Sequence, residues 1–160
     1  MKGVSFLENN YLGLIAIIEE RDGISAIEFL KNQKDRIELL RNMKESVLTK
    51  DCKKQLEEYF SGKRRKFNIK LDTMGTDFQK SAWEAMQKIP YGKTISYSEE
   101  AKMIGNEKAV RAIGLANGKN RIPIIIPCHR VIGKNGKLVG YTGGLHIKEY
   151  LLNLEKTYSM

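Results

Sequence analysis

The sequence predicts an α/β protein of two subdomains: a sheet with helices over residues 1–73, and a helical, helix-turn-helix-like domain over residues 74–160. Three observations support this prediction. The chain has 160 residues, which suits one ordinary domain or two small ones. Strand-like patterns dominate the first half, whereas apolar residues recur every three or four positions in the second. The pattern changes around residues 72–76, where we expect the boundary.

Strand and helix patterns follow each other in the first half. Residues 11–18 form an apolar run typical of a buried strand, residues 20–23 a tight turn, and residues 24–30 the returning strand. Apolar side chains at helical spacing predict a helix over residues 45–60. Residues 67–71 alternate and predict one more strand. The first half is therefore expected to be a sheet with helices.

Helical spacing dominates the second half. The first helix is expected over residues 78–89, with one apolar face. Ser98 is expected to cap a short helix that ends near Gly105, and Asn106 to cap another that ends before Gly118. Two short helices joined by a glycine turn fit a helix-turn-helix, although any hairpin of two helices gives a similar pattern.

Three elements are expected after this pair of helices. Residues 124–126 predict a short buried strand, residues 134–137 a turn, and residues 147–155 the last helix. Hydrophobic residues make up 41% of the chain and charged residues 29%, which favours a folded, soluble protein over a disordered one. The chain has no internal repeat and no low-complexity segment.

The net charge is positive, with 28 Lys and Arg residues against 19 Asp and Glu, a formal charge of +9 and a pI near 9.5. Residues 1–73 contribute 15 basic and 12 acidic side chains, and residues 74–160 contribute 13 and 7. The excess therefore lies mostly in the second half. A basic domain attracts polyanions such as nucleic acid, but a solvated lysine-rich surface gives the same balance.

Neither a membrane segment nor a metal centre is expected. The apolar stretch over residues 12–18 is too short to span a bilayer and follows no basic region, so neither a membrane anchor nor a signal peptide is predicted. The expected compartment is the cytoplasm, with the nucleoid in a prokaryote, or the nucleus in a eukaryote. Cys52, Cys128, His129 and His146 lack the close spacing of zinc ligands, and no cofactor is predicted. Cys52 lies on the apolar stripe of its helix and is interpreted as core.

The segment that carries candidate chemistry is Cys128-His129-Arg130, preceded by a proline. A free thiol has a pKa of about 8.5, so only about 3% is thiolate at neutral pH. A nearby imidazole can accept the proton, and Arg130 adds positive charge that favours the anion. In an extended segment, however, the His129 side chain would point away from Cys128, so it would act around a bend or through a water. Alternatively, Cys128 is a small apolar residue that ends a buried strand, or it pairs with His146 as in a cysteine protease.

Residues 127–132, Pro-Cys-His-Arg-Val-Ile, resemble the active-site signature of the methylated-DNA–protein-cysteine methyltransferases, which remove alkyl groups from O6 of guanine. The resemblance covers roughly residues 74–156, about half of the chain. It includes further matching positions, which are Phe78-Gln79, Trp83, Ile89-Pro-Tyr-Gly92, Thr94, Ser96-Tyr97, Ala101, Ile104-Gly105, Arg111-Ala112, Gly114, Asn120, Gly140-Tyr141, Gly143-Gly144, Lys148, Leu151-Leu152 and Glu155.

The resemblance implies a fold and a partner. Residues 1–73 resemble the family's variable N-terminal domain, an RNase H-like sheet with helices. Residues 74–160 resemble its winged helix-turn-helix-like helical domain, which carries the active site. The implied partner is duplex DNA that contains O6-alkylguanine, with O4-alkylthymine as a further candidate lesion, and a monomer is expected. Because the damaged base is stacked inside the duplex, the protein must rotate it out of the helix before it reacts.

The resemblance also implies a role for each catalytic position. Cys128 looks like the acceptor of the alkyl group, in a single irreversible turnover, because the thioether is not readily hydrolysed. His129 resembles the base that acts through a water, and Glu155 the carboxylate that orients it. Tyr97 resembles the donor to the departing guanine.

Binding residues follow from the same resemblance. Arg111 looks like the arginine that fills the space left by the flipped base through the minor groove, with the small Ala109 before it. Asn120 resembles the residue that ties the helix-turn-helix to the active-site segment, and it is grouped with Arg130 among the DNA-binding positions. Three further positions, namely Tyr141, Thr142 and the carbonyl of Val131, correspond to the pocket that holds the base.

The sequence departs from the family pattern at a few places and leaves two other functions open. Arg121 stands where many relatives have proline, and Thr142 where some have serine. The first half lacks a Cys and His cluster that some members use for zinc. An alkyltransferase-like protein that only recognises lesions is the main alternative, but such relatives replace the acceptor cysteine. A winged-helix regulator would bind unmodified and alkylated duplexes equally well.

Overall fold

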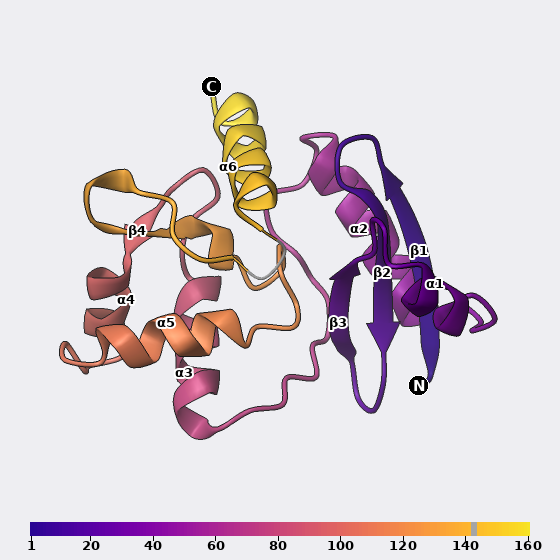
Figure 1. The fold of residues 1–160 in the computed structure, drawn as a ribbon, viewed down its shortest axis with the longest axis horizontal. Helices are drawn as coiled ribbons and strands as arrows, with labels where there is room; N and C mark the ends of the chain where they lie inside the picture. The colour runs from indigo at the N-terminus through magenta and orange to yellow at the C-terminus, as the bar shows by residue number, and fades with distance from the viewer. Residues whose placement is uncertain (142–143) are drawn as a thin grey trace. The chain divides into compact units, whose positions relative to one another are not determined.

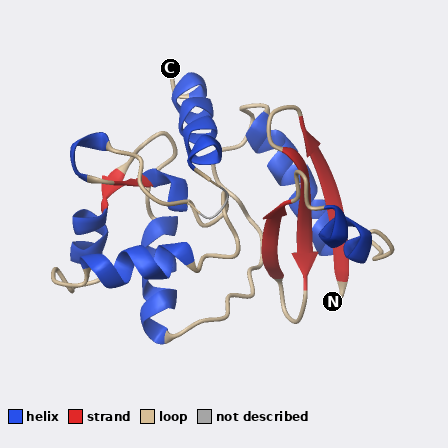
Figure 2. Ribbon diagram, in the orientation of Figure 1, coloured by secondary structure: helices blue, strands red, loops and turns tan. Residues whose placement is uncertain are grey.

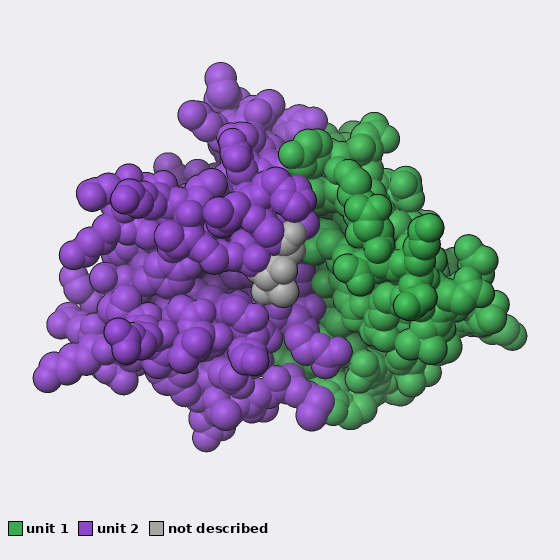
Figure 3. Space-filling view, in the orientation of Figure 1, with its two compact units in different colours: residues 1–73 green, residues 74–160 purple. Residues whose placement is uncertain are grey.

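A computed structural model describes residues 1–141 and 144–160 of the chain. Their contacts divide the chain into two compact units, residues 1–73 and residues 74–160, which Figure 3 colours separately. Each unit has its own core cluster of buried apolar side chains. None of the helices in the described ranges is long and apolar enough to cross a membrane.

The first unit contains an antiparallel three-stranded sheet in the order β1-β2-β3 (Figures 1 and 2). Its strands are β1 (Gly3–Asn9), β2 (Gly13–Glu19) and β3 (Ile24–Phe29). The sequence predicts β2 and β3 but not β1. Two buried polar residues on β1, Ser5 and Asn9, interrupt its apolar pattern. Ser5 is satisfied by hydrogen bonds to Glu45 and Thr49 at 2.6 and 2.9 Å.

Two helices accompany this sheet, α1 (Lys34–Leu40) and α2 (Val47–Phe60). The helix α2 begins at a capping box in which Ser46 and Thr49 satisfy each other's backbone N–H groups. It contacts all three strands. On its buried face lies Cys52, whose pKa burial raises to about 12, so this thiol belongs to the core as predicted. The helix α1 is not predicted.

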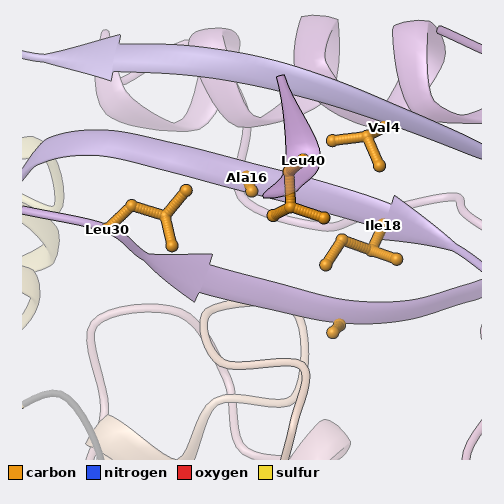
Figure 4. Close-up of a cluster of buried hydrophobic side chains, with 6 residues drawn as sticks. Val4, Ala16, Ile18, Leu30 and Leu40 are labelled. Carbon is orange, nitrogen blue, oxygen red and sulfur yellow. The ribbon is translucent and has the colours of Figure 1, made fainter. Parts of the chain in front are cut away.

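The core cluster of the first unit is built from all three strands and α1 (Figure 4). It contains six buried apolar side chains, Val4, Ala16, Ile18, Ala26, Leu30 and Leu40, none of which is more than 1% exposed. Each large side chain buried in this way stabilises the fold by about 1.5–3 kcal/mol relative to an exposed one. The strand predicted over residues 67–71 is wrong: only Leu71 pairs, in a single parallel bridge with Ile24.

The second unit is mostly helical. Its helices are α3 (Asp77–Gln87), α4 (Tyr97–Met103), α5 (Val110–Gly118) and α6 (Leu145–Tyr158). The helices α3, α4 and α5 contact one another (Figure 1). A small apolar cluster of Ala82, Ala101, Ile113 and Ala116 lies between them.

The helix-turn-helix of this unit consists of α4 and α5. The turn contains Gly105, whose φ of 75° favours glycine at the end of a helix, as predicted. Both predicted N-caps are wrong. Ser96 caps α4 in place of Ser98, and Ala109 precedes α5 without a side-chain cap in place of Asn106.

The segment between α5 and Cys128 is a turn and not the predicted strand. The backbone N–H of Ile126 donates to the carbonyl of Ile122 at 3.0 Å, and Ile124 adopts a φ of 75°. Asn120 holds the turn, because its Oδ1 accepts from the N–H of Ile122 at 2.9 Å and its Nδ2 donates to the carbonyl of Ile126 at 2.9 Å. An apolar run indicates burial but does not specify the backbone conformation.

This turn leads into the candidate chemistry. A short 3₁₀ helix, η1 (Cys128–Arg130), is followed by β5 (Val131–Ile132), which pairs in parallel with β4 (Ile95–Ser96). The turn predicted over residues 134–137 contains a second short 3₁₀ segment, η2 (Lys134–Gly136), in which Asn135 adopts a left-handed φ of 63°. The ladder between β4 and β5 therefore brings the start of α4 beside the segment that carries Cys128.

Candidate active site and nucleic-acid interface

Cys128 lies at a pocket of the second unit. The pocket has a volume of about 290 Å³ and is lined by Tyr97, Gly114, Asn117, Gly118, Cys128, Gly140 and Tyr141. This volume is close to the lower end of ligand pockets, about 300–1,000 Å³, and suits a single planar ring system. A Cβ at Gly114 or Gly118 would meet no atom within 4 Å, so α5 leaves this side of the pocket open.

A buried ion-pair cluster stands next to Cys128 in the sequence. Glu155 on α6 meets both residues that follow the cysteine: its Oε2 lies 2.5 Å from His129 Nε2, and Arg130 donates to Oε1 and Oε2 at 2.9 and 3.0 Å. The backbone N–H of Gly92 donates to Oε1 at 3.0 Å. His129, Arg130 and Glu155 are 0%, 6% and 1% exposed. We call these three residues the Glu155 cluster.

The protonation states of the Glu155 cluster follow from its contacts. Burial alone would raise the pKa of Glu155, but the hydrogen bond from His129 and the hydrogen bonds and charge of Arg130 outweigh it and hold this pKa well below its usual range. Burial lowers the pKa of His129, so its ring is neutral at pH 7 despite the nearby carboxylate. Because Nε2–H donates to Glu155, the lone pair of the neutral ring is on Nδ1, which is buried without a hydrogen-bond partner among the described residues. His129 is thus poised to accept a proton at Nδ1.

Three side chains favour the anionic form of Cys128, namely Asn120, Lys148 and Tyr141. Burial raises the pKa of this thiol above its ordinary value, so it rests as a thiol. The Nδ2 of Asn120 donates to Sγ at 3.3 Å, and this bond together with the charge of Lys148 acts in the opposite direction. Arg130, which the sequence suggested as the stabilising charge, is instead paired with Glu155.

Lys148 is a residue for which the sequence predicted no role. Its side chain is fully buried, and its Nζ donates to the carbonyls of Val131, Val139 and Gly140 at 2.7, 3.0 and 3.4 Å. Burial lowers the pKa of Lys148, and a charge on Cys128 raises it again, so the two groups stabilise each other's charged form. A lysine on the buried face of α6, beside Ile147 and Leu151, is the signal that could have identified it.

Replacing Lys148 by methionine tests this pairing. We expect the pKa of Cys128 to rise and the thiol to react about tenfold more slowly near neutral pH, the effect of about 1.4 kcal/mol. The measurement is the pH dependence of alkylation of Cys128 by a small reagent such as iodoacetamide. Lys156→Met, an exposed lysine on the same helix, is the matched control. An unchanged pH profile for Lys148→Met would limit Lys148 to holding the three carbonyls.

The structure separates the predicted DNA-binding residues into two groups. Arg111 on α5 is exposed, and Ala109 lies at the N-terminus of the same helix. Asn120 and Arg130 are buried, at 4% and 6% exposure. Arg130 donates to the Ile89 carbonyl at 2.7 Å as well as to Glu155, so its guanidinium faces the interior and its assignment to DNA contacts is wrong. Asn120 likewise positions the thiol and the turn before it.

The predicted pocket residues also differ in their placement. Tyr97 and Tyr141 line the pocket beside Cys128, and burial raises the pKa of both phenols, which are therefore neutral donors at pH 7. The Tyr97 hydroxyl donates to the Val139 carbonyl at 3.1 Å. The Val131 carbonyl already accepts from Lys148. Thr142, together with the neighbouring Gly143, lies outside the described residues.

Among the described residues, no group of three or more His, Cys, Asp or Glu side chains is placed to hold a metal ion.

A helix-turn-helix beside a pocket with a buried thiol, a neutral imidazole and an oriented carboxylate defines a class: proteins that bind nucleic acid and carry their own nucleophile. The chain matches two family profiles, described as the DNA binding domain of 6-O-methylguanine DNA methyltransferase, over residues 77–157, and the ribonuclease-like domain of the same family, over residues 7–73. The protein belongs to the 6-O-methylguanine DNA methyltransferase family, and the predicted fold class is confirmed.

Relatives cover nearly the whole chain. A methylated-DNA–protein-cysteine methyltransferase of Methanosarcina acetivorans is 50% identical over 145 residues, which is 90% of this chain and 92% of that protein. The constitutive methylated-DNA–protein-cysteine methyltransferase of Bacillus subtilis is 45% identical over 150 residues, 91% of this chain and 90% of that protein. The crystal structure of Mycobacterium tuberculosis OGT in complex with DNA is 39% identical, with a TM-score of 0.83 over 96% of this chain and 92% of that one.

Proposed function

We propose that this protein repairs O6-alkylguanine in duplex DNA by transferring the alkyl group to Sγ of its own Cys128, once per molecule. The observation that carries the proposal is the buried thiol at the pocket, followed directly by a histidine whose Nε2 is bound to Glu155 and whose buried Nδ1 has no hydrogen-bond partner among the described residues. Membership in a family of DNA repair methyltransferases supports the same conclusion. Residues 74–160 would carry both DNA binding and chemistry, in a monomer that acts where the DNA is, in the cytoplasm or in a nucleus.

The chemical step is an in-line displacement at carbon. The thiol gives its proton through a water to His129 Nδ1, and the imidazolium is stabilised by Glu155. The thiolate attacks the alkyl carbon, so the S–C bond forms while the bond from carbon to O6 breaks and its electron pair stays with guanine. The proton lost by the thiol returns to the guanine. Tyr97 offsets the negative charge on the departing guanine by donating a hydrogen bond to it. To do so, its hydroxyl must leave the Val139 carbonyl, to which it donates in this structure.

DNA recognition is assigned to α5. Its exposed Arg111 would enter the space left by the flipped nucleotide, because a planar guanidinium can stack on bases and hydrogen-bond the orphaned partner. The glycines of α5 that line the pocket give the base a path from this helix toward Cys128. Contacts of this kind read the minor groove weakly, which suits lesions in any sequence context.

The direct test is the mass of the intact protein and its peptides after mixing with a duplex that carries one O6-methylguanine. We expect one methyl group in place of hydrogen, located on Cys128 and never more than one per protein. Tight binding to that duplex without a mass change would make the protein a lesion sensor, a function that the presence of Cys128 disfavours. Equal binding to the unmodified duplex would point to a plain DNA-binding regulator.

Replacing Arg111 by alanine separates base flipping from chemistry. We expect repair of a duplex substrate to slow by about 100-fold, since unstacking a base costs a few kcal/mol and loses its compensation. Reaction with free O6-methylguanine base should change by less than about twofold, because no stacked base has to be extruded. Rate constants for both substrates are measured by single-turnover kinetics. Equal losses on both would contradict the flipping role.

A further inference from the structure

A buried carboxyl of the second unit has no part in the reaction proposed above. Glu100 on α4 is 0% exposed, and its Oε1 accepts a hydrogen bond of 2.7 Å from Nδ2 of Asn117 on α5. The two remaining oxygens of the pair, Glu100 Oε2 and Asn117 Oδ1, are both buried without a hydrogen-bond partner among the described residues. Two acceptors left over in one buried pair indicate that a donor, and therefore a proton, is needed there.

The surroundings do not supply a cation to Glu100. The charged side chains of the helices packed around it are all exposed, namely Asp77, Lys80, Glu84, Glu99, Lys102 and Arg111. Burial raises the pKa of Glu100 and the hydrogen bond from Asn117 lowers it, with a net value of about 7. Tyr97 is the titratable group whose pKa responds to Glu100: a negative charge on Glu100 raises it. The other titratable groups near Asn117 are Cys128 and Tyr141, which line the same pocket.

We infer that Glu100 is held as the neutral carboxylic acid and acts as a positioning residue for the pocket, paired with both arms of the Asn117 carboxamide. Asn117 Nδ2–H donates to Glu100 Oε1. A proton on Glu100 Oε2 would donate to Asn117 Oδ1, and these are the two atoms of the pair that lack a partner among the described residues. One proton taken from solvent thus satisfies both unpaired oxygens. Asn117 lines the pocket between Gly114 and Gly118, so the pair fixes the wall along which the base would lie.

Loss of this proton would loosen the wall. The carboxylate would repel Asn117 Oδ1, and a charge without a cation would remain buried between α4 and α5. Ionisation in the folded protein is centred near the pKa of about 7. In the unfolded chain the same group has its ordinary value of 4.5. Because the folded pKa is the higher one, the stability contributed by the proton is complete below 4.5 and declines until the pH reaches about 7.

Glu100→Gln provides the test, because its amide pairs with Asn117 in the same way at every pH. The matched control is Glu99→Gln, an exposed neighbour that keeps the N-terminal capping box with Ser96. We expect the unfolding equilibrium constant of the unsubstituted protein to rise by about 300-fold relative to that of Glu100→Gln from well below pH 4.5 to well above about pH 7, and then to level off. Glu99→Gln should parallel the unsubstituted protein. A difference that does not vary with pH would overturn the inference.

A kinetic measurement tests the positioning role and rests on the proposed alkyl transfer. The transfer rate of the unsubstituted protein, divided by that of Glu100→Gln and normalised at about pH 6, should fall by up to tenfold at about pH 8, as the neutral fraction of the acid falls. Cys128 and His129 titrate equally in both proteins and cancel in this ratio. A constant ratio would overturn the positioning role.

A third measurement needs neither a substitution nor activity. The ¹³C resonance of the Glu100 carboxyl in the unsubstituted protein should titrate near pH 7, whereas a value near 4.5 would overturn the inference. This readout stays valid if Glu100→Gln fails to fold. It also distinguishes the two failures: a protein without alkyl transfer can still show the raised titration, and an active protein can lack it.

Discussion

The substitution Cys128→Ser is expected to abolish alkyl transfer, with a loss on the order of 10⁴-fold or more in rate. A serine hydroxyl is far less acidic than a thiol, so neither His129 nor Lys148 can generate the anion at neutral pH. The loss is measured by the mass of the protein after mixing with the O6-methylguanine duplex. Binding of duplex DNA should remain within about twofold, because Cys128 is only 8% exposed and contributes no charge to the surface.

Cys52→Ala is the matched control for this substitution. Cys52 is buried on α2 in the first unit, and burial raises its pKa to about 12. We expect this variant to transfer the alkyl group at the unsubstituted rate and to accept one methyl group, still on Cys128. Methyl transfer that survives Cys128→Ser but fails in Cys52→Ala would identify Cys52, in the first unit, as the acceptor and would contradict the proposal. Loss of DNA binding in Cys128→Ser would make Cys128 a structural residue.

The second large effect is expected for Glu155→Gln, which keeps the size of the side chain and removes its charge. Arg130 would then be a buried cation without its anion, which typically costs about 3–5 kcal/mol of unfolding free energy. The imidazolium formed during transfer would also lose its counter-charge, so we expect the rate to fall by about 100-fold or more. Thermal unfolding and single-turnover kinetics measure the two effects separately.

Glu28→Gln is the control, because Glu28 forms a bidentate pair with Arg36 that is partly exposed to solvent. Exposed pairs contribute at most about 1 kcal/mol, so this variant should resemble the unsubstituted protein.

The loss of stability at acidic pH provides a second check on the role of Glu155. The depressed pKa of Glu155 means that its contribution is present above the ordinary carboxyl value of 4.5 and is lost as the pH falls toward its folded value. In Glu155→Gln that part of the acid sensitivity should disappear. Equal acid sensitivity in both proteins would contradict the assigned pairing.

Local patterns predicted the elements that depend on local signals. The helices α3 and α6 have apolar stripes, and the glycine of the turn before α5 indicates its own conformation. The strand β1 was not predicted, because the hydrogen-bond partners of its buried Ser5 are Glu45 and Thr49, some forty residues away. Such distant partners produce no pattern in the local sequence. The helix α1 was not predicted, because it is short and its N-cap residue, Gln33, makes no side-chain capping hydrogen bond.

The candidate site shows the same division. The motif at residues 127–132 located the thiol, and the resemblance placed Glu155 beside His129, where the structure has it. The sequence did not indicate that Glu155 also binds Arg130. Because of this pairing, Arg130 lies in the interior and does not serve as the predicted DNA contact. Nor did it assign Lys148 or Glu100, because each is a charged residue whose function depends on burial created by other elements.

The left-handed conformation of Ile124 has a consequence for the order in which the protein assembles. A β-branched residue disfavours a φ of 75° by about 1–3 kcal/mol, so the isolated segment does not adopt this turn on its own. The surrounding core, in which Ile124 is 1% exposed, has to impose it. We therefore expect the turn before Cys128 to form late in folding and to be among the first segments to open. Until the domain has closed around it, the chain carries an ordinary cysteine, and the reactive one is a property of the finished fold.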